Sequence, residues 1–353
     1  MAQKIAIIAP PFISVPPKGQ GGTEIIIDET IKEFLKRKYD VYLFGAGKYK
    51  GKAKFIQVFK KTISEIKTNP DKIEASRALR LETAYISSVM KELIKNDGKF
   101  DIIFNHARGG YLFLPITEFI KTPIVNILHL PIFKEMEGVI SSYKNPNIVT
   151  ISNSQRKGFK KINYLKTIYN GIDITKFKFN KNPDNYFLFM GALGEHKNPK
   201  DAIRAIKKTK YNLIIAGGKK REPYFTKEIK PLIDGKKIKY VGEVSGKEKH
   251  DLLKNASGFL FPINWEEPFG LVMIEAMACG TPVIAYPRGA TKEVIRNKKT
   301  GFIVKNVEEM TKAINNISLI DRSLCRKEVE KKFTSKKMTD DYESLINKLI
   351  NKK

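Results

Sequence analysis

Cysteines and long apolar runs are scarce in this 353-residue chain, and each scarcity excludes a class of protein. Cys279 and Cys325 are the only two cysteines, too few for a disulfide framework, so a reducing cytoplasmic compartment is expected. No apolar run approaches the roughly 18 residues that a membrane-spanning helix needs. Residues 5–9 are apolar but are followed by Pro10 and Pro11, which predicts a buried first strand and not a signal peptide.

Acidic residues are also few: 37 Asp and Glu stand against 65 Lys and Arg, a formal net charge of +28. Such an excess favours an anionic partner, which could be nucleic acid, anionic lipid or a phosphorylated substrate. The basic residues are not grouped around base-stacking aromatics, so we expect no nucleic acid partner.

Two explanations of the charge stay open. One is a compositional bias toward lysine, and the other is peripheral contact with the anionic inner face of a membrane. The lysine-rich segments that would make this contact lie near the N-terminus, at Lys32, Lys36, Arg37, Lys38, Lys48, Lys50, Lys52 and Lys54.

Short apolar runs alternate with segments of helical periodicity along the whole chain. In the first half, strands are predicted at residues 5–9, 41–44, 101–104, 124–128 and 148–151, and helices at 24–37 and 76–95. In the second half, strands are predicted at residues 187–193, 213–216, 238–241, 259–262, 282–285 and 301–304, and helices at 200–208, 247–255, 270–279 and 307–317. This alternation predicts an α/β protein with parallel sheets covered by helices on both faces.

The alternation stops between residues 169 and 186, where Asn170-Gly171 and Asn182-Pro183 are typical of loops. We therefore expect two doubly wound Rossmann-like domains, residues 1–168 and 169–334, with a ligand site between their strand carboxyl ends. Residues 335–353 are predicted to be a helix that packs back against the first domain. A helix that stays on the second domain is the alternative.

A glycine-rich loop, Gly-Gln-Gly-Gly-Thr-Glu at residues 19–24, lies between the first strand and the first helix. Glycines let the backbone approach a ligand, and a helix N-terminus favours phosphate. The loop is neither a dinucleotide fingerprint, because its sixth residue is Glu24, nor a Walker loop, because no Gly-Lys pair precedes Ser or Thr. Taken alone, a plain turn would explain it equally well.

The most informative block is residues 265–280, Trp-Glu-Glu-Pro-Phe-Gly-Leu-Val-Met-Ile-Glu-Ala-Met-Ala-Cys-Gly. Its helix is mostly apolar and should be buried, so the carboxylate of Glu275 needs partners. A ribose diol would supply two hydroxyls, whereas an internal salt bridge is the alternative. Glu267 lies just before the helix, where the amides of Gly270 and Leu271 can meet a phosphate.

This block resembles the E-x7-E signature of glycosyltransferase family 4, a family of retaining enzymes with the GT-B fold. Further segments follow the family pattern in order: the glycine loop, His129 after a strand, the Asn-Gly-Ile-Asp of 170–173, the 191–197 segment that ends in Lys197, and 289–293. The resemblance covers most of the chain. It implies a GT-B fold, with two Rossmann-like domains facing a cleft and a C-terminal helix that crosses back.

The resemblance also implies roles for individual residues. Glu275 would hold the ribose hydroxyls, Lys197 the diphosphate and Glu267 the transferred sugar, with backbone amides of Phe269, Gly270 and Leu271 completing the donor site. From the first domain, Gly21 and Gly22 would close on the diphosphate, and His129 would contact the sugar near the reacting carbon. A buried core histidine is the alternative for His129, and His106, which also follows a strand, is a second candidate.

Two positions depart from the family pattern. Ala192 stands where the family usually has an arginine that contacts the diphosphate, which removes a bidentate contact. Ala290 stands where a glycine is usual. No Asp-x-Asp motif and no His/Glu metal spacing occurs in the sequence, so we expect neither a metal nor another cofactor.

The sequence thus predicts a retaining, metal-independent transfer of a hexose from a nucleoside diphosphate sugar to a hydroxyl acceptor, such as a glycolipid, a polysaccharide precursor or a small molecule. Three alternatives stay open. They are a non-catalytic sugar-binding protein on the same fold, a sugar-nucleotide epimerase or phosphorylase, and a charge-driven nucleic-acid-binding protein.

Overall fold

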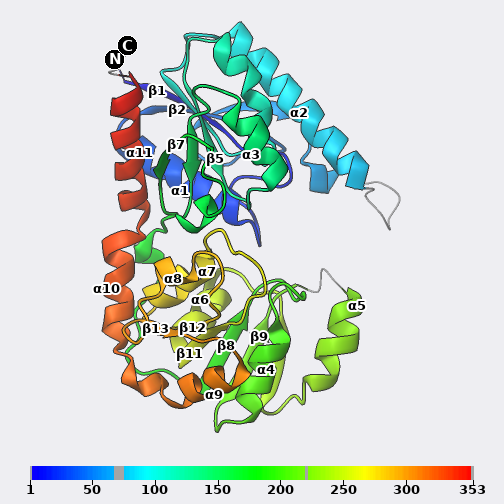
Figure 1. The fold of residues 1–353 in the computed structure, drawn as a ribbon, viewed down its shortest axis with the longest axis vertical. Coiled ribbons are helices and arrows are strands. Elements are labelled where there is room, and N and C mark those ends of the chain that lie inside the picture. The colour runs from blue at the N-terminus through cyan, green and yellow to red at the C-terminus, as the bar shows by residue number, and fades with distance from the viewer. Residues whose placement is uncertain (1, 67–74, 219–221, 351–353) are drawn as a thin grey trace. The chain divides into compact units, whose positions relative to one another are not determined.

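The computed structural model describes residues 2–66, 75–218 and 222–350, which form two compact α/β units (Figure 1). The first unit comprises Met1–Gly171 together with Ser335–Lys353, and the second comprises Ile172–Thr334. The sequence pattern had put the junction between residues 168 and 169. Each unit contains one parallel sheet, so the predicted α/β class with two Rossmann-like units is confirmed.

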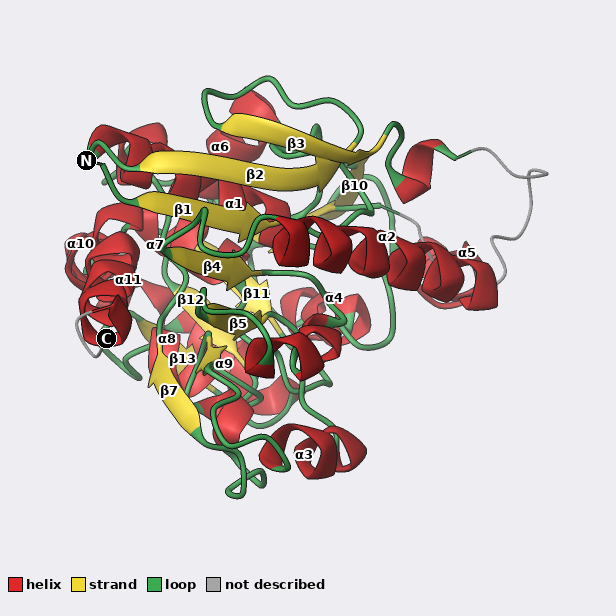
Figure 2. Cartoon of the chain, turned by 90° about the horizontal axis from the view of Figure 1, so that it is seen from above, coloured by secondary structure: helices red, strands yellow, loops and turns green. Residues whose placement is uncertain are grey.

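The sheet of the first unit has seven strands in the order β3-β2-β1-β4-β5-β6-β7. The strands are β1 (Lys4–Ile8), β2 (Asp40–Ala46), β3 (Lys54–Phe59), β4 (Ile102–Asn105), β5 (Ile124–Leu128), β6 (Ile148–Thr150) and β7 (Tyr164–Thr167). All neighbouring strands pair in parallel, and Figure 2 shows β1, β2 and β3 side by side. Their carboxyl ends therefore share one edge, where the loops that follow β1, β4 and β5 meet.

Helices α1 (Gly22–Lys36), α2 (Ala75–Lys95), α3 (Lys134–Ser141) and α11 (Ser335–Ile350) belong to this unit. Side chains alternate between the two faces of a strand, and β4 shows this clearly. Ile103 joins the apolar cluster that contains Tyr85 and Val89 of α2, whereas the ring of Phe104 stacks on Phe34 of α1. Helix α2 thus covers one face of the sheet and α1 the other.

Helix α11 packs beside α1 on that second face, although 298 residues separate the end of α1 from the start of α11 (Figure 1). Tyr342 of α11 is 1% exposed, and its ring lies 5.0 Å from that of Phe104. The guanidinium of Arg37, at the end of α1, pairs with Asp340 at 2.8 Å and with Glu343. An aromatic contact and charged pairs therefore fix the C-terminal helix to the first unit.

The second unit is a six-stranded parallel sheet in the order β10-β9-β8-β11-β12-β13. Its strands are β8 (Tyr186–Met190), β9 (Asn212–Ala216), β10 (Ile238–Gly242), β11 (Gly258–Phe261), β12 (Val283–Ala285) and β13 (Gly301–Ile303). Its helices are α4 (Pro199–Lys207), α5 (Glu222–Tyr224), α6 (Gly246–Asn255), α7 (Leu271–Ala278), α8 (Thr291–Val294), α9 (Val307–Asn315) and α10 (Arg322–Lys332).

Helices α4 and α9 cover one face of this sheet, where Ile203 and Ile314 share a cluster with Phe187 and Leu260. Helices α7 and α10 pack against each other, and α6 contacts α7. Helix α7 carries its buried side chains all round, with Met273, Ile274 and Met277 at 0% exposure. A charged residue on this helix must therefore find its partner inside the protein.

Six of the described helices and strands were not predicted from the sequence: β3, β7, α3, α10 and the short helices α5 and α8. Strands β3 and β7 are the two edges of the first sheet, where side chains are only half-buried and the apolar pattern is weak. Helix α10 is mostly charged and buries only one side. Each of these elements is stabilised by its neighbours more than by its own pattern.

The contact of Tyr342 with the core of the first unit gives a stability prediction. Replacing it by Ala should lower the free energy of unfolding of this unit by about 3–5 kcal/mol, because a large buried ring is lost. Its hydroxyl has no hydrogen-bond partner among the described residues, so Tyr342→Phe should cost less than about 1 kcal/mol.

The unfolding free energies of the Tyr342 variants can be measured by urea unfolding, followed by far-UV circular dichroism and by tryptophan fluorescence. Trp265 is the only tryptophan and lies in the second unit, so the Ala variant should move the dichroism transition more than the fluorescence transition. If the Phe variant loses as much stability as the Ala variant, the hydroxyl has a partner and the packing argument is wrong.

Candidate functional site

The strand order of the second unit reverses between β8 and β11. The chain leaves β8 through α4 on one face and leaves β11 through α7 on the other. In open α/β sheets, ligands bind outside the carboxyl ends of the strands at such a reversal, because the two loops diverge there. A ligand site of this unit is therefore expected at the loops that follow β8 and β11.

Lys197, from the loop after β8, meets Glu267 and Trp265 from the loop after β11. The ammonium of Lys197 pairs with Oε2 of Glu267, and the indole Nε1 of Trp265 donates to the same oxygen at 3.0 Å. The Lys197 Nζ also lies 5.0 Å from the centroid of the Trp265 ring, within cation–π range. These three residues form what we call the switch-point cluster.

Backbone contacts join the two loops of this cluster to each other and to the loop after β12. The amide of Asn264 donates to the carbonyl of His196 at 2.8 Å, and the amide of Ala290 donates to the carbonyl of Glu267 at 3.0 Å. Gly289 has a φ of +54°, and a Cβ at this position would lie 2.1 Å from the Glu267 carbonyl oxygen. A side chain at residue 289 would therefore displace the backbone that carries Glu267.

Helix α7 begins beside this cluster. Gly270 precedes it with a φ of +82° and supplies no side-chain cap, and the first amides of a helix have no partner within the helix. The ring of Phe269 is 2% exposed and packs against Phe333 at 5.8 Å, so only its backbone is suited to a ligand. The start of α7 thus combines backbone donors and a positive dipole end with the ammonium of Lys197.

Glu275 lies one turn further along α7 and is 4% exposed. Its Oε1 accepts a hydrogen bond of 2.6 Å from the ammonium of Lys249 on α6. This is the internal salt bridge that the sequence left open as the alternative to a ribose contact. The ion pair offsets the cost of burying the carboxylate, so burial alone does not require a ligand at Glu275.

In the first unit, His129 follows β5 and His106 follows β4. Their rings stack with centroids 5.1 Å apart, and Nδ1 of His106 lies 2.8 Å from Nε2 of His129, so the two imidazoles share a hydrogen bond. Burial lowers the pKa of His129 to about 4, with a smaller effect from Arg108, and lowers the pKa of His106 well below its usual value. Both rings are therefore neutral at physiological pH.

Two buried asparagines support the histidine pair. The amide of Asn105 donates to the side-chain oxygen of Asn126 at 2.8 Å and to the carbonyl of Gly110 at 3.2 Å. Both asparagines are fully buried: Asn105 is the last residue of β4, and Asn126 lies in the middle of β5. The Asn105 side chain also accepts a hydrogen bond from the amide of Ala107, so the network fixes the loop after β4 and the position of His106.

The glycine loop precedes α1 on the same sheet. A Cβ on Gly21 would lie 2.6 Å from Ile13 and 3.0 Å from the carboxylate of Glu24, so the close packing of the loop favours glycine there. Gly22 is the first residue of α1. Glu24 is 3% exposed, and burial raises its pKa.

The structure thus brings together Lys197 and Glu267 in the second unit, with Phe269, Gly270, Leu271 and Glu275 following along the same segment. Gly21, Gly22 and His129 lie at the carboxyl edge of the first sheet. Sequence reasoning assigned no role to Trp265 or Lys249 and named no partner for His106. Each of these contacts joins segments that only the fold brings together, except that Trp265 is two residues from Glu267.

Within residues 2–66, 75–218 and 222–350, no group of three or more His, Cys, Asp or Glu side chains is arranged to hold a metal ion. None of the helices in the part of the chain that is described has the length and apolarity to cross a membrane.

The second unit resembles a known protein family. Residues 172–333 match the family described as "Glycosyl transferases group 1". The O-antigen chain mannosyltransferase RfbU of Salmonella typhimurium is 32% identical over 169 residues, which is 44% of this chain and 47% of the relative. The chain spans about half the length of the curated relatives that it matches.

Solved structures match the whole chain. A sucrose-phosphate synthase from Thermosynechococcus elongatus superposes with a TM-score of 0.78 and 16% identity, covering 99% of this chain and 100% of the other. The Anabaena protein HepE, in complex with UDP and glucose, gives a TM-score of 0.73 with 16% identity and covers 98% and 100%. The chain therefore has the GT-B fold of glycosyltransferases.

The histidine pair of this GT-B protein predicts a pH dependence of stability. Both pKa values are lower in the folded state than the value of about 6.5 in an unfolded chain, so the unfolded state binds more protons between pH 6.5 and about 4. Stability is fully present above pH 6.5 and is lost as the pH falls through this window, by about 1.4 kcal/mol per pH unit for each histidine.

His106→Gln removes one of the two groups, so the stability difference between wild type and variant should shrink as the pH falls from 7 to 5. Urea unfolding at a series of pH values measures that difference. A difference that is constant with pH would show that His106 is not held neutral by burial.

Proposed function

We propose that this protein is a retaining glycosyltransferase that moves a hexose from a nucleoside diphosphate sugar to a hydroxyl acceptor without a metal ion. The switch-point cluster is the observation that carries the proposal. It puts a cation, a carboxylate and an open helix start at the reversal of strand order, inside the segment that resembles group 1 glycosyl transferases. The structure of HepE with UDP and glucose supports a nucleotide-sugar ligand on this fold.

On the donor side, the diphosphate would lie against the amides of Gly270 and Leu271 and the ammonium of Lys197. An ammonium has three N–H donors, and Lys197 uses one of them on Glu267, so it can hold this carboxylate and a phosphate together. Glu267 would then accept hydrogen bonds from the hydroxyls of the transferred sugar. Lys197 and the dipole of α7 would offset the charge that develops on the leaving diphosphate.

Glu275 would hold the ribose as a second partner beside Lys249. Oε1 of Glu275 accepts a hydrogen bond from Lys249, so the other oxygen of the carboxylate would accept hydrogen bonds from the ribose hydroxyls. From the first unit, Gly21 and Gly22 would contact the diphosphate through their backbone, and neutral His129 would exchange a hydrogen bond with the sugar near its reacting carbon.

In the proposed reaction, the bond from the anomeric carbon to the diphosphate oxygen breaks while a bond to the acceptor oxygen forms on the same face. The hydroxyl proton of the acceptor passes to the leaving phosphate, so no enzymic nucleophile is required. Because the acceptor bonds to the face of the anomeric carbon from which the diphosphate leaves, the anomeric configuration is retained.

The proposal includes peripheral contact of the first unit with an anionic membrane. Within the lysine-rich segments, Lys32, Lys36 and Lys54 are each paired with an acidic residue, and Arg37 is tied to α11. The exposed lysines that remain are Lys38, Lys48, Lys50 and Lys52. These four could bring the first unit to anionic lipid and a lipid-linked acceptor, at about 1 kcal/mol for each lysine near the surface.

The function is tested by release of the nucleoside diphosphate from UDP-, GDP- and ADP-hexoses, with and without an acceptor alcohol. One donor should be turned over, a chelator should have no effect, and NMR of the product should show a retained anomer. Glu267→Gln should lower turnover about 100-fold, and Glu275→Ala should weaken donor binding by about 1.5–3 kcal/mol.

Glu330→Gln, which changes an exposed carboxylate on α10, is the matched control and should behave as wild type. Donor binding without release would favour a non-catalytic sugar-binding protein, and conversion of the donor without acceptor would favour an epimerase. Sedimentation with anionic and neutral vesicles tests the membrane contact, and equal partitioning to both would refute it.

A further inference from the structure

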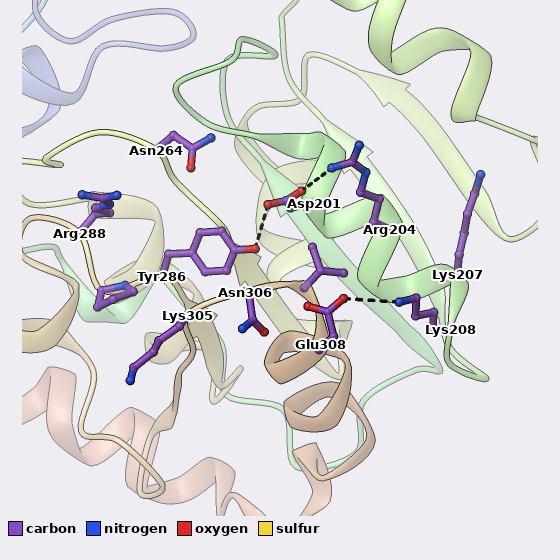
Figure 3. Close-up of a pocket in the computed structure, with 12 residues that line it drawn as sticks. Asp201, Arg204, Lys207, Lys208, Asn264, Tyr286, Arg288, Lys305, Asn306 and Glu308 are labelled. Carbon is purple, nitrogen blue, oxygen red and sulfur yellow. Dashed lines mark hydrogen bonds and ion pairs between the residues drawn. The ribbon is translucent and has the colours of Figure 1, made fainter.

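The second unit has a hollow of about 830 Å³ whose lining includes residues of α4 and of the start of α9 (Figure 3) and none of the three residues of the switch-point cluster. It lies between α4 and the start of α9, where the loops after β11, β12 and β13 converge. Tyr286 is 7% exposed and lies against α4, so it forms part of a fixed wall. The space is large enough for a small organic ligand.

The lining of this hollow is strongly basic. Five of its 12 residues are cations, whereas Lys and Arg make up 65 of the 353 residues in the chain. The five are Arg204, Lys207, Lys208, Arg288 and Lys305. The local excess therefore goes well beyond the basic composition of the protein as a whole.

The two acidic residues of the lining are already engaged. Asp201 accepts hydrogen bonds from the hydroxyl of Tyr286 at 2.9 Å and the amide of Asn198 at 2.8 Å, and pairs with Arg204 at 3.3 Å. Glu308 pairs with Lys208 at 3.7 Å. Among the ion pairs of the described residues, Lys207 and Lys305 take part in none, so the hollow keeps a positive excess.

Two further features favour an anion. Helix α9 begins at the hollow, and the positive end of its dipole adds to the field of the cations. Among the ion pairs of the residues that the structure describes, the guanidinium of Arg288 takes part in one, an exposed and long contact of 3.7 Å with Glu266, so it can turn to a ligand. A planar guanidinium beside ammonium groups suits the oxygens of phosphate.

We propose that this hollow binds a small anion with several negative charges of the phosphate class, such as a phosphorylated saccharide, at a site separate from the switch-point cluster. Lys207, Lys305 and Arg288 supply the charge. Arg288 also contacts Glu266, which is next to Glu267 in the chain. An anion bound to Arg288 would therefore be linked through this residue to the loop that carries Glu267. The binding itself does not depend on the proposed glycosyl transfer.

Calorimetric titration of the whole chain with inorganic tripolyphosphate, at about 0.15 M salt to screen long-range attraction, tests the site. The double variant Lys207→Glu/Lys305→Glu should weaken binding at least tenfold. The control Lys239→Glu/Lys331→Glu makes the same change of net charge at exposed lysines that line neither site, and it should bind as wild type does. Thermal melts establish that both variants are folded.

Lys197→Met separates this hollow from the proposed donor site. If the hollow is the anion site, this variant keeps its tripolyphosphate binding. The proposal is overturned if tripolyphosphate binding is lost in Lys197→Met and kept in Lys207→Glu/Lys305→Glu. It is also overturned if Lys207→Glu/Lys305→Glu and the control Lys239→Glu/Lys331→Glu lose binding equally. Binding of a nucleic acid by wild type and control alike, without a tripolyphosphate site, also overturns it in favour of general charge attraction.

Discussion

Two carboxylates buried at helix α7, each paired with a lysine from another element, are the constraint on which the site of the second unit depends. Glu267 is held by Lys197 and Glu275 by Lys249. Removing a charge from water is costly unless a partner compensates for it. The segment from residue 265 to 278 can therefore be buried only where the loop after β8 and helix α6 bring those lysines to it.

The parallel sheet satisfies this constraint through its topology. Because the strand order reverses between β8 and β11, the loops that follow them diverge and leave room for the side chains of Lys197, Trp265 and Glu267. Gly289 lets a third loop, the one after β12, approach the Glu267 backbone. The amide of Ala290 on this loop donates to the Glu267 carbonyl and so fixes the backbone that carries the carboxylate. In the first unit, the buried Asn105 fixes the loop that carries His106, and His106 in turn shares a hydrogen bond with His129.

Much of the fold could be predicted from the sequence, because buried parallel strands are continuous apolar runs and the helices between them have a clear period. The predicted strand at residues 259–262 and β11 (Gly258–Phe261) differ by one residue at each end. Edge strands β3 and β7 and the charged helix α10 were not predicted, since their positions depend on neighbours and not on their own pattern.

The candidate residues could be named from the sequence, but their contacts could not. Lys197 and Glu267 are 70 residues apart, and Lys249 and Glu275 are 26 apart. Side chains at such separations meet only through strand order, which a single sequence does not display. The same holds for the hydrogen bond between His106 and His129, and for the basic hollow, whose cations come from three separate segments.

The emission of Trp265 under titration with UDP, GDP or ADP tests the central claim most directly. This residue is the only tryptophan, it donates to Glu267, and it lies against the ammonium of Lys197. If the switch-point cluster binds the diphosphate, one nucleotide will change the emission with saturation, and Lys197→Met will abolish the change. Calorimetric binding of a nucleotide that leaves the emission unaltered, or an equal response in Lys197→Met, would contradict the account.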